Sequence, residues 1–226
     1  MNRVSPRFIS YDSLQSTMPE WDDIFEEQGR VFTEPHQDME QVVQIFQERH
    51  VKRVLDIGCG SGRHLVYFSK RGFETYGFDV SQNALSLAHE WLKEENLQAT
   101  IITHRMEKRF PYQDSFFDAA ISTQVIHHNR MREILFTVGE IERVLRSGGV
   151  LFVTFPILSE VPSEGDKGWK LEQIEPETYI PHHGPEAGIP HHYFTEEEVY
   201  KVFDGFDIQS IAIDETRHRC VLGIKK

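Results

Sequence analysis

The sequence contains a short apolar strand that runs directly into three glycines at alternate positions. Residues 54–62 read Val-Leu-Asp-Ile-Gly-Cys-Gly-Ser-Gly. A glycine at the end of a strand lets the backbone turn tightly and approach a ligand closely, because no Cβ stands in the way. This pattern predicts a turn between a strand and a helix that contacts a small ligand.

The spacing of the glycines narrows the choice of ligand. A dinucleotide fingerprint has the pattern G-x-G-x-x-G. Here Gly58, Gly60 and Gly62 alternate, and Arg63 occupies the place of the third glycine of that pattern. The Gly-Lys-Ser/Thr ending of a phosphate loop is also absent. We therefore expect a nucleoside ligand without a pyrophosphate.

Two acids accompany the glycine turn. Asp56 lies inside the strand just before the glycines, where a carboxylate can hold a cationic amino group directly or through water. Residues 74–79 form a second short strand that ends in Asp79. In a right-handed βαβ unit this strand lies next to the first, so its carboxylate can accept hydrogen bonds from both ribose hydroxyls.

Four motifs in this order resemble those of class I S-adenosylmethionine-dependent methyltransferases, over roughly residues 36 to 155. They are the glycine motif at 54–62, the ribose-binding strand end at 78–81, the fourth strand at 117–122 and the turn before the fifth strand at 144–149. Gly-Arg-His after the first motif and Gln-Val-Ile-His-His after the fourth strand are most similar to small-molecule members of the family, including the tellurite-resistance type.

This resemblance implies a fold, an activity and a cofactor. The fold is α/β, a seven-stranded, mostly parallel, doubly wound Rossmann-like sheet with an antiparallel C-terminal hairpin. The activity is transfer of a methyl group from S-adenosyl-L-methionine to a small-molecule acceptor by in-line displacement. The residues that the resemblance places at the cofactor are Asp56, Gly58, Cys59, Gly60, Gly62, Asp79, Val80, Met106, Glu107 and Gln124.

The sequence departs from the family after the third strand. Arg105 stands where the family usually has an acid that contacts the adenine amino group. Either backbone groups of Met106 and Glu107 or the side chain of Glu107 would have to replace that acid. Two other functions therefore stay open: a non-catalytic S-adenosylmethionine-binding regulatory module, and a nicotinamide-dependent oxidoreductase, which Arg63 disfavours.

Strands and helices alternate along the chain, which indicates a parallel sheet covered on both faces. We expect a helix from Met39 and a capped helix at 195–203. The other expected elements are strands at 53–57, 74–79, 99–103, 117–122 and 150–155, helices at 62–71, 82–95 and 130–146, and a hairpin of 206–213 with 220–224. The whole chain, 1–226, is expected to be a single domain, with 1–35 as an arm that covers the site and 156–195 as a lid-like insertion.

Displacement of a methyl group from a sulfonium needs alignment and exclusion of water, and it needs no covalent residue. His127 and His128 follow the fourth strand, and either imidazole could serve as a general base. The alternative is that one of them caps the following helix or is satisfied in packing.

Residues 179–194 carry two His-His pairs on a segment rich in proline and glycine, which we interpret as a loop. The segment is either a solvated or packed loop, a substrate lid or a metal site. Adjacent histidines rarely point the same way and no zinc-ligand spacing is completed, so we expect no metal. The acids around them favour a cationic or neutral substrate. The residues expected to cover the substrate are Tyr11, Trp21, His182, His183, His191, His192 and Tyr193.

Composition excludes several classes of partner. The formal net charge of −12 argues against nucleic acid, because binding to it depends on clustered Lys and Arg. No run of 18 apolar residues predicts a membrane span, and no apolar leader is seen. The two cysteines read as reduced thiols, so we expect a cytoplasmic protein. The sequence does not specify the acceptor atom or the oligomeric state.

Overall fold

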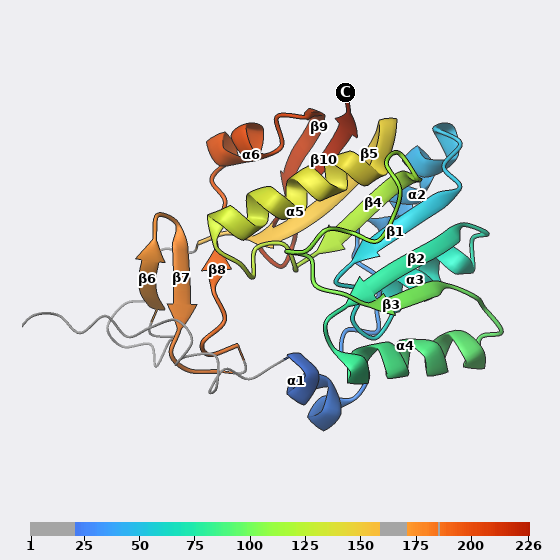
Figure 1. Ribbon diagram of the computed structural model, residues 1–226, viewed down its shortest axis with the longest axis horizontal. Helices are drawn as coiled ribbons and strands as arrows, with labels where there is room; N and C mark the ends of the chain where they lie inside the picture. The colour runs from blue at the N-terminus through green and yellow to red at the C-terminus, as the bar shows by residue number, and fades with distance from the viewer. Residues whose placement is uncertain (1–20, 159–170, 185) are drawn as a thin grey trace, which may run out of the picture.

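The computed structural model describes residues 21–158, 171–184 and 186–226 (Figure 1). Its main sheet has seven strands in the order β3-β2-β1-β4-β5-β10-β9. The strands are β1 (Arg53–Ile57), β2 (Glu74–Asp79), β3 (Thr100–Thr103), β4 (Phe117–Thr123), β5 (Leu145–Pro156), β9 (Phe206–Ile213) and β10 (His218–Lys225). The first five are parallel to one another, and β10 is antiparallel to both β5 and β9. The predicted fold class is confirmed.

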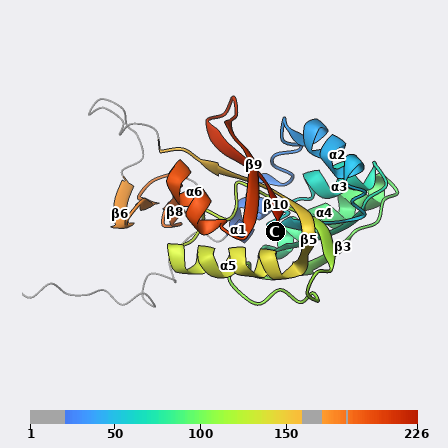
Figure 2. The same cartoon turned by 90° about the horizontal axis from the view of Figure 1, so that it is seen from above.

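Six helices lie in the described part of the chain, and they pack on both faces of the sheet. They are α1 (Trp21–Gln28), α2 (Met39–Glu48), α3 (Arg63–Ser69), α4 (Gln82–Glu94), α5 (Met131–Val144) and α6 (Glu196–Val202). Figure 2 shows α5 and α6 on one face of the sheet and α2 and α3 on the other. Such double coverage explains why the central strands are apolar at nearly every position.

Two hydrophobic cores form on the two faces because successive side chains of a strand point in opposite directions. Leu55 of β1 packs in the core under α5, together with Ile134 and Val138 of that helix. Val54 packs in the other core, with Val43 and other residues of α2. Asp56, next along β1, therefore points toward the face that carries α2 and α3.

Local signals placed most element ends correctly. The predicted cap of α6 is present, since the Thr195 hydroxyl accepts a hydrogen bond from Glu198 N–H and the Glu198 carboxylate accepts one from Thr195 N–H. The strand expected at 150–155 instead extends from Leu145 to Pro156, with an irregular register opposite β4.

Three strands and one helix were not predicted. The sequence predicts a loop at 179–194, within the lid-like insertion 156–195, and that prediction is wrong for part of the segment. A second, antiparallel sheet consists of β6 (Leu171–Glu175), β7 (Thr178–Pro181) and β8 (His191–His192). Helix α1 was also missed. In Figure 1 this small sheet and α1 lie on the side to which the arrowheads of β1, β2 and β4 point.

None of the helices in these described ranges is long and apolar enough to cross a membrane.

Two glycines that flank α3 allow a test of why this part of the chain needs glycine. Gly62 precedes the helix with φ +91°, and a Cβ there would lie 2.9 Å from the Cβ of Ala88 on α4. Gly72 follows the helix with φ +83° and has open space around it. Both positions are left-handed, but only Gly62 is also limited by a packing neighbour.

We predict that Gly72→Ala lowers the free energy of unfolding by about 1–2 kcal/mol, which is the backbone cost alone. Gly62→Ala should lower it by about 1–3 kcal/mol more, because the added methyl group overpacks the contact with α4. Chemical denaturation of both variants measures the difference. Equal losses would show that the contact with Ala88 relaxes freely.

Candidate active site

A cavity of about 390 Å³ lies at the carboxyl ends of β1, β2 and β4. This volume is typical of sites for small molecules and cofactors, and open α/β sheets bind ligands at this edge. The walls come from the turns after these strands and after β3, from α1, and from the segment that leads into and out of β8.

Most of the predicted cofactor residues line this cavity. They are Gly58, Cys59, Gly60, Asp79, Val80, Met106, Glu107 and Gln124. Asp56 and Gly62 do not line it. Asp56 is 2% exposed. The preceding residue, Leu55, faces α5, so Asp56 points to the opposite face of the sheet, toward α3. Gly62 serves the packing of α3 against α4 instead.

The glycine turn is confined by neighbouring side chains. Gly58 and Gly60 have φ values of +70° and +52°. A Cβ at Gly58 would lie 2.4 Å from a methyl carbon of Val125, and one at Gly60 would lie 3.2 Å from the ring of Phe25. The N–H groups of Gly58 and Cys59 both donate to the carbonyl of Phe78, which fixes the turn to β2. The turn therefore exposes backbone to the cavity and has little room for side chains.

Asp79 connects this turn to the next helix. One carboxylate oxygen accepts the Gly60 N–H at 2.9 Å, and the other accepts the Ser81 N–H at 3.0 Å. Each carboxylate oxygen can accept a second hydrogen bond, and the side chain lines the cavity. Burial raises the pKa of the Asp79 carboxyl, and the two N–H donors oppose that rise.

Helix α1 is anchored over the cavity by Asp22. The Asp22 carboxylate accepts hydrogen bonds from the Ser81 hydroxyl at 2.7 Å and from the Asn83 N–H at 2.9 Å. These are groups at the N-terminus of α4, where an anion is favourable. The anchor holds Trp21 and Phe25 in the cavity wall.

A charged group lies at the floor beside the glycine turn. Arg63 lines the cavity and donates to the Thr123 hydroxyl at 3.3 Å and to the Glu34 carbonyl at 3.4 Å. One oxygen of the buried Asp56 carboxylate has no hydrogen-bond partner. Burial raises the pKa of Asp56 to about 7, although the charge of Arg63 opposes the rise.

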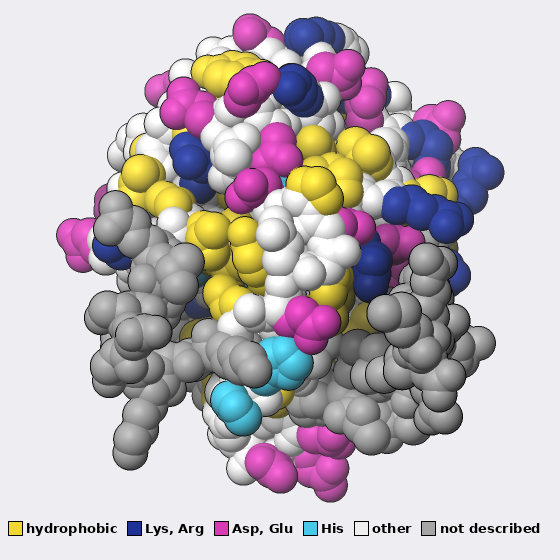
Figure 3. All heavy atoms as spheres, turned by 90° about the vertical axis from the view of Figure 1, so that its left-hand side faces the viewer, with side chains coloured by type: hydrophobic (Ala, Val, Ile, Leu, Met, Phe, Trp, Pro, Cys, Tyr) yellow, Lys and Arg dark blue, Asp and Glu magenta, His cyan; other side chains and the backbone are white. Residues whose placement is uncertain are grey.

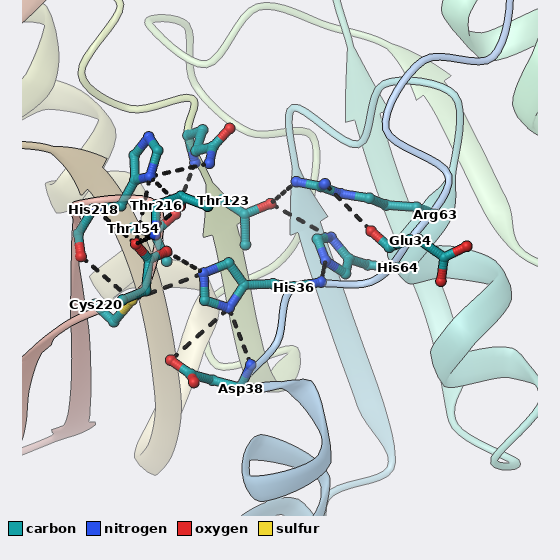
Figure 4. A network of polar contacts seen from close by, with 12 residues as sticks. Glu34, His36, Asp38, Arg63, His64, Thr123, Thr154, Thr216, His218 and Cys220 are labelled. Atoms are coloured by element: carbon teal, nitrogen blue, oxygen red, sulfur yellow. Dashed lines mark hydrogen bonds and ion pairs between the residues drawn. The ribbon is translucent and has the colours of Figure 1, made fainter.

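His64 lies beside Thr123 and His36 in a network of polar contacts (Figure 4). Its Nε2 accepts the backbone N–H of His36 at 3.2 Å, so the proton is on Nδ1. That Nδ1 lies 3.5 Å from the Thr123 hydroxyl and 3.9 Å from Asp56 Oδ2. Burial, with the charge of Arg63, holds the pKa of His64 well below its ordinary value, so the ring is neutral. His36 is held in turn by Asp214, at 3.0 Å.

Three histidines line the opposite part of the cavity. The ring centroids of His127 and His128 are 3.9 Å apart, and that of His191 lies 4.7 Å from His128. Burial lowers the pKa of His128 to about 3, with a contribution from His191, and holds that of His127 well below its ordinary value. Both imidazoles are therefore neutral near pH 7. Trp21 packs on His128 with centroids 5.0 Å apart.

Only some of the predicted lid residues line the cavity. Trp21, His191 and Tyr193 line the cavity. His182 and His183 are exposed in the turn after β7. His192 faces away from the cavity, and its Nδ1 contacts the Thr178 hydroxyl at 2.8 Å. Tyr11 lies outside the described residues.

The second His-His pair forms strand β8. The sequence predicts a loop at this position, so that prediction is wrong. Neighbouring side chains on a strand point to opposite faces. That geometry is why His191 reaches the cavity and His192 does not.

After β3, Arg105 stands where related methyltransferases usually have an acid, and the structure shows what it contacts. The Arg105 guanidinium forms an ion pair with the Glu107 carboxylate, and both side chains line the cavity. The Met106 carbonyl accepts the hydroxyl of Thr137 at 3.0 Å. Contact of Met106 and Glu107 with an adenine stays a prediction.

Comparison with known proteins identifies this arrangement. Residues 55–153 match the family profile described as a methyltransferase domain. The chain contains a class I methyltransferase domain. Methyltransferases of this class use S-adenosylmethionine as the methyl donor, and the solved structures with this fold include S-adenosylmethionine-dependent methyltransferases.

Curated relatives align with the methyltransferase domain alone. Ubiquinone biosynthesis O-methyltransferase of Azoarcus sp. (strain BH72) is 31% identical over 101 residues, which are 45% of this chain and 42% of that protein. Ribosomal RNA small subunit methyltransferase C of Alcanivorax borkumensis is 29% identical over 104 residues, 45% of this chain and 31% of that protein. The chain thus spans less than half the length of these relatives.

Solved structures share the fold over most of the chain. The PH0226 protein of Pyrococcus horikoshii OT3 superposes with a TM-score of 0.68 at 18% identity, covering 96% of this chain and 100% of that one. TehB of Haemophilus influenzae superposes with a TM-score of 0.63 at 17% identity, covering 91% and 67%.

The cavity of the methyltransferase domain fits its donor. The glycine turn leaves room for the backbone to approach a ligand, and Asp79 keeps acceptor capacity for ribose hydroxyls. Arg63 lines the cavity and would offer a cation to the carboxylate of the methionine moiety. Apolar side chains such as Phe78 and Val80 line the remaining wall.

Sequence reasoning missed several residues of the wall. Arg63 and His64 directly follow the glycine turn, and their position in the sequence was a sufficient signal. Phe25, Glu186 and His218 line the cavity from distant segments, and no local pattern pointed to them.

Asp56 makes the stability of the domain depend on pH in a definite direction. Because its pKa is about 7 in the folded protein and ordinarily 3.8, the folded state keeps a proton that the unfolded state has released. The free energy of unfolding therefore falls by ~1.4 kcal/mol per pH unit between about pH 4 and about pH 7.

We predict that Asp56→Asn removes this fall, so its stability relative to wild type rises between about pH 5 and about pH 8. Chemical denaturation at both values measures it. Asp118→Asn is the control. The Asp118 pKa lies below its ordinary value, since hydrogen bonds from Arg53 and Arg146 outweigh its burial, and its titration is complete below this range. Parallel pH profiles for wild type and Asp56→Asn would contradict the prediction.

Proposed function

We propose that this chain transfers a methyl group from S-adenosylmethionine to a small-molecule acceptor by in-line displacement. The observation that carries the proposal is one cavity lined by the glycine turn and Asp79 in one part and by the histidines in the other. A donor on the glycine turn and an acceptor beside the histidines would share one space.

The chain's own residues would hold the donor by separate contacts. Asp79 would accept the ribose hydroxyls, and Gly58 and Gly60 would let the backbone approach the methionine moiety. Arg63 would pair with the carboxylate of that moiety. Bound S-adenosylmethionine would supply an electrophilic methyl group on a sulfonium.

Gln124 supports placement of the reacting groups at the end of β4. It has a φ of +61°, which is uncommon for a residue other than glycine and recurs at functional sites. Its N–H donates to the Thr154 hydroxyl at 3.0 Å, and its side-chain amide lies 3.5 Å from His218 Nδ1. These contacts hold Gln124 in the wall between the two parts of the cavity.

Aromatic residues would exclude water from the acceptor. Trp21 and Tyr193 line the cavity from α1 and from the residue after β8. A dry, aligned site is the main requirement of a displacement reaction. We therefore propose that the described parts of the segments 1–35 and 156–195 cover the site, as the sequence suggested.

His127 and His128 remain candidates for handling a proton. A neutral imidazole accepts a hydrogen bond from a hydroxyl, thiol or amine, which would orient the acceptor. With a pKa of about 3, His128 is a weak base near pH 7. Glu186 lines the same region, and its pKa is below the ordinary value because the hydrogen bond from His191 outweighs its burial.

A small acceptor is favoured over RNA. The formal charge of −12 opposes a polyanion. On the face in Figure 3, acidic and basic side chains are mixed and hydrophobic ones gather near the centre. Two of the relatives are ribosomal RNA methyltransferases, so RNA is the competing class that an experiment has to include.

The function is tested by donor consumption. The chain is incubated with S-adenosylmethionine and a panel of small hydroxyl, amine, thiol and carbon acceptors, with total ribosomal RNA as a separate arm. S-adenosylhomocysteine formation and product mass are measured. Turnover with a small acceptor supports the proposal, and turnover with RNA alone contradicts it. Donor binding without turnover on any acceptor would favour a regulatory module.

We predict that Asp79→Ala weakens S-adenosylmethionine binding about 10- to 100-fold, the scale of losing hydrogen bonds to a charged group. Isothermal titration calorimetry measures the change. Glu74→Ala is the control, because Glu74 is exposed at the other end of the same strand. Equal affinities for wild type and Asp79→Ala would contradict the assignment of this site.

We also predict that Trp21→Ala separates donor from acceptor effects. Its ring packs on His128, at the acceptor part of the cavity. We expect a rise of about tenfold or more in the acceptor KM, on the scale of losing a buried aromatic contact, and a donor Kd within about twofold of wild type. A larger effect on donor binding than on the acceptor KM would show that Trp21 belongs to the donor site.

A further inference from the structure

Three histidines bring possible metal-ligand atoms together at the acceptor part of the cavity. His127, His128 and His191 each offer a ring nitrogen, and these atoms all lie within 4.8 Å of one another. The first two follow β4, and the third is on β8. The cluster thus joins the main sheet to the small one.

The cluster contains a buried atom that lacks a partner. His127 is 3% exposed, and its Nδ1 has no hydrogen-bond partner. A buried polar atom without a partner costs stability, and native proteins rarely keep one without a reason. Both ring nitrogens of His191, by contrast, have a partner. A bound cation would satisfy this atom.

The backbone holds the cluster in place without using the ring nitrogens of the first pair. The His127 carbonyl accepts the N–H of His192 at 2.8 Å, which fixes the turn after β4 against β8. His191 Nδ1 contacts the Ile189 carbonyl at 2.9 Å, so Nδ1 carries a proton. A metal would therefore bind Nε2, after displacing the proton that Nε2 shares with Glu186. Metal-ligating histidines usually donate their other N–H in this way.

Glu186 completes the set of donors. Its Oε2 lies 2.7 Å from His191 Nε2, and the side chain lines the cavity. A carboxylate only accepts, so Nε2 donates a proton to it in this structure. A metal would take the place of that proton, with Glu186 as a fourth ligand or a close partner.

We propose that His127, His128 and His191, with Glu186, form a site for a divalent transition metal of the zinc type. Neutral imidazoles together with one carboxylate oxygen suit Zn²⁺, and other metals of its row, better than Mg²⁺ or Ca²⁺.

The metal site stands independently of methyl transfer, but its role rests on the proposed function. A metal held here would face the acceptor part of the cavity. It would bind the nucleophilic oxygen, nitrogen or sulfur of the acceptor and favour its deprotonated form. The sequence predicts no metal, because adjacent histidines rarely point the same way and no zinc-ligand spacing is completed. The three histidines proposed here come from two segments that lie far apart along the chain.

A second group, His36, Asp38 and Cys220, also places its donor atoms within 4.8 Å. It is a weaker candidate for a metal. His36 Nε2 is already bonded to Asp214 at 3.0 Å. Burial holds the pKa of the Cys220 thiol far above its ordinary value, whereas a metal binds the thiolate. Cys220 therefore provides a control.

The test measures metal binding by the whole chain without S-adenosylmethionine. The protein is stripped with a chelator and titrated with Zn²⁺ against a chromophoric competitor. We expect one tight equivalent, weakened at least about 100-fold by His128→Ala or His191→Ala and about 10- to 100-fold by Glu186→Gln. His89→Ala, at an exposed histidine of α4, and Cys220→Ala should bind like wild type.

Cobalt provides a measurement on the wild-type chain that needs no variant. We expect visible bands of a four- or five-coordinate Co²⁺ with no thiolate charge-transfer band. Absence of a tight equivalent in wild type overturns the proposal, as does a thiolate band or loss of binding in Cys220→Ala. So does unchanged affinity in a His128→Ala protein whose circular dichroism is native.

The two proposals can fail separately. Zinc binding without methyl transfer on any acceptor would leave the metal site intact and overturn the function. Methyl transfer that persists in the stripped protein, with no Zn²⁺ bound on titration, would overturn the metal site alone.

Discussion

The carboxylate of Asp79 holds together the three elements on which the cavity depends. It accepts the N–H of Gly60 in the glycine turn and the N–H of Ser81 at the start of α4. Ser81 in turn donates to Asp22, which fixes α1 across the opening. The proposed donor contact and the position of α1 in the cavity wall are thus linked through one buried acid. Its raised pKa shows that the fold pays for desolvating it.

Much of the main sheet could be predicted from the sequence because its signals are local. Strand β1 ends at its glycines, β2 ends at Asp79, and α6 begins at a capping box, all within a few residues. Helix α1 and strand β8 gave no such signal. Helix α1 depends on one acid that reaches the start of α4, and β8 has two residues that are strand only because β7 pairs with them.

In the candidate site, too, the residues that could be predicted are those with a local sequence signal. Residues that directly follow strands, such as Gly58 and Val80, line the cavity as the motif suggested. Asp56 does not, because alternation along β1 turns it toward α3, and a motif match does not contain that information. The contact of His191 with His128 could not be predicted, since it depends on the register of β8 against β7 and on the hydrogen bond to the His127 carbonyl.

That hydrogen bond, from the N–H of His192 to His127, is the described backbone connection between the small sheet and the turn after β4. The groups proposed to bind the donor lie at the ends of strands of the main sheet, whereas the opposite wall combines the turn after β4 with residues of the small sheet. The strands β7 and β8 could therefore be replaced by another segment of similar length without changing the strands of the main sheet. Related proteins would then differ in the acceptor that they prefer and keep the same proposed binding site for the donor.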